Sequence, residues 1–162
     1  YRDAKILTIY EGTTAIQAND LVGRKTARDG GQTARAVAAQ IEATERQLAG
    51  GSSDAQAVAR RLATARQAFL DVVDFMAAQA RANPNAAYAG SVPYLMLAGW
   101  QLGRALIAAE QQKAAGHDAA FMTAKIATAR FYADHILTRV PGVRDAIVEG
   151  ADSVTALAPD AF

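Results

Sequence analysis

Apolar residues recur at helical spacing over most of the chain, starting after a pair of glycines at positions 30 and 31. Val37, Ile41, Thr44 and Leu48 are separated by four, three and four residues, so they share one face of a helix. This pattern predicts a first amphipathic helix that ends at Gly50-Gly51.

Three further stretches carry the same spacing and predict three further long helices. Ser52-Ser53-Asp54 is typical of a helix start and precedes a stripe from Val58 to Met76, which ends at Asn83-Pro84-Asn85. The polar stretch from there to Ser91 predicts a loop. A third helix is predicted from Pro93, with Leu95, Leu102 and Leu106 on its apolar face, to a cap at Gly116. Asp118 opens a fourth helix, which stops at Val140-Pro141-Gly142, and a short last helix is predicted from Val143 to Glu149.

The fold class follows from these stripes and from the short loops between them. No segment shows the period-two alternation that is typical of a half-buried strand. Long helices joined by loops of a few residues pack as antiparallel neighbours. The sequence therefore predicts an all-α protein, an up-down antiparallel helical bundle of about four long helices over residues 32–140.

The first 30 residues have a different character and predict a loop and one helix. An apolar segment with Ile6, Leu7 and Ile9 is compatible with a strand or with the last turns of a helix. Thr13 or Thr14 is a suitable N-cap for the helix that follows, which ends in a basic stretch at Arg28. We therefore place a boundary near Gly30-Gly31, with one unit at 1–30 and a helical bundle domain at 31–162.

Composition excludes several functions for this chain of 162 residues with a formal net charge of +1. That charge gives no surplus for binding nucleic acid, and no apolar run approaches the roughly 20 residues of a membrane span. There is no cysteine for a disulfide, thiolate nucleophile or zinc site. Because the chain begins with Tyr1 and carries no signal-peptide pattern, we expect it to be a piece of a longer soluble, cytoplasmic protein.

Side chains with evident chemistry are few in the bundle region. His117 and His135 have no histidine partner at helical spacing, so no metal site is expected. No glycine-rich phosphate-binding loop is present. Aromatic residues exceed what a single apolar stripe needs, and this predicts subunit or interdomain surface at Phe69 with Phe75, Tyr94 with Trp100, and Phe131 with Tyr132.

The opening segment carries a motif. Arg2-Asp3, Ile9-Tyr10-Glu11-Gly12-Thr13 and Ile16-Gln17 lie in one register over about twenty residues. This run closely resembles the end of the catalytic core of acyl-CoA dehydrogenases. The helical remainder resembles the extra C-terminal domain of the branch of that family with larger subunits.

The resemblance implies a reaction and a site. Family members oxidise an acyl-CoA thioester to its 2-enoyl form, an oxidoreductase step of fatty acid metabolism that removes the α-proton and transfers the β-hydrogen to FAD as hydride. Glu11 matches the catalytic base, while Tyr10 and Gly12 match residues that bind substrate. Thr13, Thr14 and Ala15 match positions that contact FAD, Ala15 through its backbone alone.

The resemblance also implies partners and a role for the bundle. The longer parent is expected to be a homodimer that binds acyl-CoA and passes electrons to an electron-transfer flavoprotein or a similar acceptor. The isolated chain should be inactive, with residues 1–28 displaced, partly disordered or held by a neighbouring chain. The alternative is a non-catalytic helical module for interaction or oligomerisation, and the bundle could serve either assembly or control of substrate access.

Overall fold

The computed structural model describes residues 2, 5–6, 9, 12–98, 115–116, 118–154, 156–157 and 159–161. Within these residues every regular element is helical, which confirms the predicted all-α class. The α-helices are α1 (Thr14–Asp20), α2 (Gln32–Ala49), α3 (Ser53–Ala82), α4 (Pro84–Ala89), α5 (Ser91–Leu97), α7 (Ala119–His135), α8 (Val140–Val148) and α9 (Ala151–Val154). A π-helix, η2 (Leu21–Ala27), continues α1, and two 3₁₀ helices are η3 (Leu137–Arg139) and η4 (Pro159–Ala161).

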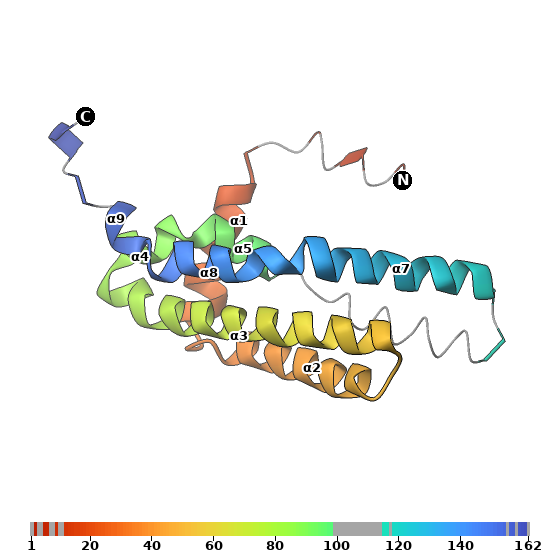
Figure 1. Ribbon diagram of the computed structural model, residues 1–162. Helices are drawn as coiled ribbons and strands as arrows, with labels where there is room; N and C mark the ends of the chain where they lie inside the picture. Colours follow the sequence, from red (N-terminus) through yellow and green to blue (C-terminus); the bar gives the residue numbers. More distant parts are fainter. Residues whose placement is uncertain are drawn as a thin grey trace.

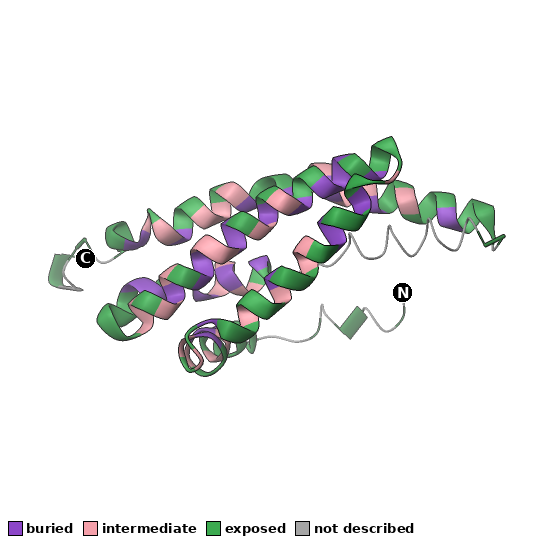
Figure 2. Ribbon diagram, turned by 90° about the horizontal axis from the view of Figure 1, so that it is seen from below, coloured by how far each residue is buried: buried purple, intermediate pink, exposed green. Residues whose placement is uncertain are grey.

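Helix α3 is the centre of the bundle, and α2 packs antiparallel to it (Figure 1). The predicted end of α2 at the glycine pair and the predicted cap of α3 are both confirmed. Ser52 accepts a hydrogen bond of 3.2 Å from the backbone N–H of Ala55 through its Oγ. The predicted stripe of α3 is buried from Val58 to Met76, and it lies along the inside of the bundle (Figure 2).

Helices α7 and α8 run along α3 in the same direction as α3, as the second and fourth members of an up-down bundle do (Figure 1). Asp118 caps α7, because its carboxylate accepts hydrogen bonds of 3.1 Å from the backbone N–H groups of Ala120 and Phe121. The predicted last helix begins earlier than expected, at Val140. Pro141 lies in its first turn, where a missing N–H costs no helical hydrogen bond.

One prediction about the segments between α3 and α7 is wrong, and another falls partly outside the described residues. The stretch after Asn83 is helix α4 and not a loop, because Asn83 caps it and Pro84 occupies its first turn. The third predicted helix is described only as α5, and Leu102 and Leu106 lie outside the described residues.

The expectation that the first 28 residues are displaced from the bundle is wrong for residues 14–28. Helix α1 packs against α5, and η2 packs against α3 (Figure 1). Ala18 and Val22 have no accessible surface, so this segment contributes side chains to the bundle's own core. Residues 12–17 are exposed.

The prediction that the surplus aromatic residues lie on the surface is wrong for two of them and is confirmed for one. Phe69 and Tyr94 are buried in the core, where their rings stack with centroids 6.1 Å apart. Phe131 is 61% exposed, whereas Phe75 and Tyr132 are half-buried. Trp100 lies outside the described residues.

Candidate functional site

The predicted catalytic turn is described from Gly12 onward, and Tyr10 and Glu11 lie outside the described residues. Gly12 has a φ of +80°, in the left-handed region that L side chains rarely adopt. A glycine is therefore required by the backbone at this position. The conformation bends the chain immediately before α1.

Thr13, Thr14 and Ala15 form the start of α1, and all three residues are exposed. Thr13 is the N-cap but its side chain makes no capping hydrogen bond, so its hydroxyl remains available. The N–H groups of a first helical turn have no partner within the helix. These hydroxyls and amides are donors of the type that fits the polar edge of a flavin, although the described residues do not enclose a cavity around them.

Two hydrogen bonds between distant segments hold this helix and its continuation to the bundle. Asn19 in α1 accepts a hydrogen bond of 2.8 Å from the hydroxyl of Ser91, which is 3% exposed. The hydroxyls of Thr26 in η2 and Tyr94 in α5 lie 2.8 Å apart, and both side chains are buried. Burial raises the pKa of the Tyr94 phenol, and the bond with Thr26 opposes that rise. The helix that follows the predicted catalytic turn is thus connected to α5 through one part-buried and one buried hydrogen bond.

A close backbone approach explains a glycine in η2. A Cβ added to Gly23 would lie 2.6 Å from the hydroxyl oxygen of Tyr88 in α4. Sequence reasoning did not find Tyr88, Ser91 or Tyr94 as partners of the first segment. The residues of each pair are far apart in the chain, and no motif marks them.

Charged side chains between the helices form ion pairs that hold elements together. Arg66 in α3 donates a hydrogen bond of 2.9 Å to Glu45 in α2, which is 8% exposed, and this bond raises the pKa of Arg66. Arg130 lies on α7, and its hydrogen bond lowers the pKa of the Asp134 carboxyl, which also pairs with Arg61 of α3. Each of these side chains has a structural partner, so they are not free acid–base groups.

Metal ligands do not cluster in the described part of the chain, where no group of three histidine, cysteine or acidic side chains could hold an ion. His135 stacks on the ring of Phe131 with centroids 4.5 Å apart. His117 lies outside the described residues. Among the helices that are described, none is both long and apolar enough to cross a membrane.

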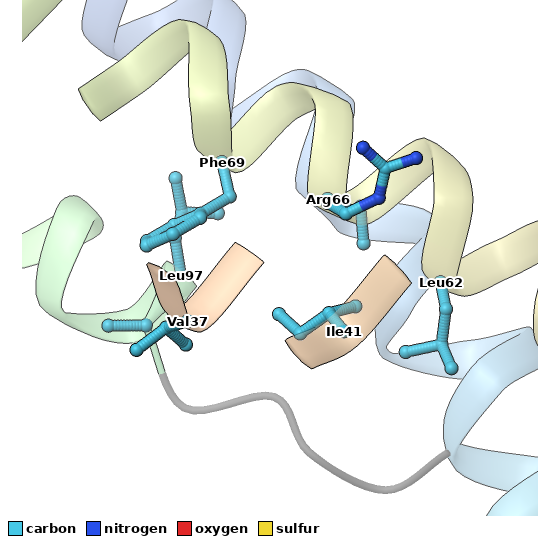
Figure 3. Close-up of a pocket in the computed structure, with 8 residues that line it drawn as sticks. Val37, Ile41, Leu62, Arg66, Phe69 and Leu97 are labelled. Atoms are coloured by element: carbon cyan, nitrogen blue, oxygen red, sulfur yellow. The ribbon is translucent and has the colours of Figure 1, made fainter. Parts of the chain in front are cut away.

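A small cavity lies between α2, α3 and α5, lined by Val37, Ile41, Leu62, Phe69 and Leu97 with Arg66 at one side (Figure 3). Its volume is about 10 Å³. A space of that size holds about one water molecule. It is therefore a gap in the packing and not a substrate pocket.

Comparison with known proteins places this bundle in a family. Residues 34–158 match the family described as "Acetyl-CoA dehydrogenase C-terminal like". The chain belongs to this family, and its resemblance to the acyl-CoA dehydrogenases is thereby confirmed.

Three relatives of this chain are named as acyl-CoA dehydrogenases. The chain is 54% identical over 159 residues to 3-methylmercaptopropionyl-CoA dehydrogenase of Ruegeria pomeroyi, and the matched region covers 95% of this chain and 27% of that protein. It is 34% identical over 163 residues to the broad-specificity linear acyl-CoA dehydrogenase FadE5 of Mycobacterium tuberculosis, with 90% of this chain and 26% of that protein matched. It is 32% identical over 154 residues to butyryl-CoA dehydrogenase of Syntrophomonas wolfei, with 88% of this chain and 24% of that protein matched. The chain spans about a quarter of the length of these relatives.

Proposed function

We propose that this chain is the C-terminal part of a flavin-dependent acyl-CoA dehydrogenase that oxidises an acyl-CoA thioester to the 2-enoyl-CoA. The observation that carries the proposal is the similarity to three acyl-CoA dehydrogenases over 88% or more of this chain. The names of these relatives give different acyl substrates, so the proposal names a thioester class and no single acyl group.

Glu11 is the proposed catalytic base. Its carboxylate would take the α-proton of the thioester, while the β-hydrogen leaves with its electron pair and a double bond forms between the two carbons. A carboxylate suits this step because exclusion of water by bound substrate raises its pKa toward that of the weakly acidic carbon.

The neighbouring residues have supporting roles in this proposal. Gly12 allows the bend before α1 and, with Tyr10, would contact the acyl thioester. Thr13, Thr14 and the backbone of Ala15 would hydrogen-bond FAD, and their exposed donors support this role. When bound, FAD supplies the acceptor for the hydride.

The 162-residue chain alone is expected to be inactive and colourless. Residues 12–15 are exposed, and nothing in the described part of the chain encloses a substrate or cofactor around them. An electron-transfer flavoprotein as acceptor, a homodimeric parent and a cytoplasmic location remain part of this proposal. Absorbance near the flavin band of the purified chain tests the first expectation.

Substitution of Glu11 tests the proposed role directly. In the full-length parent, Glu11→Gln should retain FAD and bind acyl-CoA yet reduce flavin on the order of 100- to 10,000-fold more slowly, which stopped-flow bleaching measures. Glu42→Gln is the matched control, because Glu42 lies on α2 in an ion pair with Arg46 and outside the turn. Flavin reduction within a few-fold of wild type in Glu11→Gln would show that another group takes the proton.

A non-catalytic role fits residues 31–162 taken by themselves. In this region several described charged groups, among them Arg61, Arg66 and Arg130, form structural ion pairs. The large side chains Phe121 and Phe131 of α7 are exposed. The bundle would then serve assembly of the parent, or control of access to the acyl site. Light scattering and acyl-CoA turnover of the parent with and without 31–162 separate the two roles.

The division at Gly30-Gly31 is tested by a shorter chain. Residues 32–162 should remain helical and melt cooperatively, because α2, α3, α7 and α8 bury one another. The melting temperature should fall relative to the full chain, since removal of η2 uncovers core that Val22 now covers. A product without a thermal transition would place η2 within the folding unit.

A further inference from the structure

An apolar groove lies between α5 and the segment that joins α7 to α8. Its volume is about 640 Å³, which is within the usual range for pockets that bind small molecules. The lining includes Pro93 and Met96 on one wall and Ile136, Val143 and Ala146 on the other. All of its lining residues are among those that the structure describes.

Apolar side chains along this groove remain exposed to water. Met96 is 68% exposed, and Ala146 on the facing helix is exposed as well. Apolar side chains that remain in contact with water on both sides of one hollow commonly mark a binding site. Packing in the bundle core therefore does not explain Met96, whereas a ligand in the groove would bury it.

Arg139 is the charged side chain in the groove's lining. It is exposed, and the structure records no ion pair or side-chain hydrogen bond for it among the described residues. Arg144, a few residues later on α8, differs in that it pairs with Asp71, Asp145 and Glu149. An unpaired guanidinium beside an apolar hollow presents five donors to an anionic group.

We propose that this groove binds a single-chain amphiphile with a carboxylate head, its alkyl chain between α5 and α8 and its head on Arg139. One isolated cation matches one anionic head group. The apolar lining is also far smaller than the roughly 800 Å² per partner that a stable protein interface buries, so a second protein chain fits it less well. None of the described turn residues 12–15 lines the groove, and the proposal does not depend on the proposed reaction.

Calorimetry of the 162-residue chain with sodium octanoate, decanoate and dodecanoate tests the proposal. Affinity should rise roughly fourfold for each added methylene, because each one leaves water for the groove. Decanoate should bind more tightly than decyltrimethylammonium, which has the same chain and the opposite charge. Affinity that does not depend on chain length, or equal affinity for the two head groups, would overturn the proposal.

Substitutions locate the binding in this groove. Arg139→Gln should weaken decanoate about tenfold, since a hydrogen bond to a charged group is lost. Arg81→Gln, which changes another exposed arginine at the end of α3, is the control and should leave the affinity unchanged. Ala146→Glu adds a negative charge at an exposed helical position, so the fold should persist while decanoate affinity falls.

Two results would contradict this assignment. If Arg139→Gln and Ala146→Glu both bind decanoate as the unsubstituted chain does, the amphiphile occupies another site. If light scattering shows a dimer that Ala146→Glu dissociates, a second copy of the chain covers the groove. Circular dichroism of each variant confirms that the helices remain.

Discussion

The buried hydrogen bond between Thr26 and Tyr94 allows a measured test of whether η2 is part of the folded bundle. Tyr94→Phe removes the phenol oxygen and leaves the Thr26 hydroxyl without its partner 2.8 Å away, at a position where the side chain is 1% exposed. An unpaired buried hydroxyl costs about 1–3 kcal/mol. For a chain of this length, that free energy corresponds to a melting temperature lower by roughly 2–12 °C.

The assay is urea unfolding followed by circular dichroism, which yields the free energy of unfolding from the midpoint and slope. Thr26→Val alone should cost a similar amount, whereas the double variant should cost less than the sum because both polar partners are gone. Tyr88→Phe is the control, since Tyr88 is 37% exposed and its hydroxyl makes no hydrogen bond among the described residues. Its free energy of unfolding should stay within about 0.5 kcal/mol of wild type. A Tyr94→Phe chain as stable as wild type would refute the packing of η2 against α5.

Three further variants or conditions follow from the same structure. Gly31→Ala should destabilise the chain by more than about 1 kcal/mol in urea unfolding, because φ is +83° and the added Cβ would lie 2.7 Å from a core valine. Gly50→Ala should be nearly neutral, because its Cβ would meet nothing closer than 3.9 Å. Glu45→Gln should cost about 1–3 kcal/mol in the same assay, since it leaves the partly buried Arg66 cation without its carboxylate. Because the folded state keeps the Tyr94 phenol protonated above its usual pKa near 10, stability should fall as the pH rises above about 10, and a pH series of melting curves should show a smaller fall for Tyr94→Phe.

Local sequence signals predicted most of the helical elements. The stripes of α2 and α3 and the caps Ser52 and Asp118 depend on spacing and on hydrogen bonds within a few residues, so the sequence alone contains them. Helix α4 was missed because Asn83-Pro84 both ends one helix and begins the next. The two glycines at 30 and 31 marked a real turn, but they did not reveal that η2 folds back onto α3.

Long-range contacts account for what sequence reasoning could not reach. The bonds of Asn19 to Ser91 and of Thr26 to Tyr94 join residues 72 and 68 positions apart. Phe69 and Tyr94 looked like surplus surface aromatics because their mutual packing is set by the tertiary fold. The candidate catalytic turn came from its family resemblance, since Glu11 by itself is an ordinary glutamate between a tyrosine and a glycine. The groove beside Arg139 depends on the packing of α5 beside α8, which no local pattern encodes.

Anaerobic titration of the full-length parent with acyl-CoA thioesters tests the proposed enzyme class most directly. Absorbance of the flavin band follows the reaction, with free carboxylic acids of the same chain length as controls. The proposed function predicts a yellow protein whose flavin is bleached by at least one thioester while a 2-enoyl-CoA accumulates in equal amount. A parent that carries no flavin, or whose flavin no acyl-CoA bleaches, would contradict it.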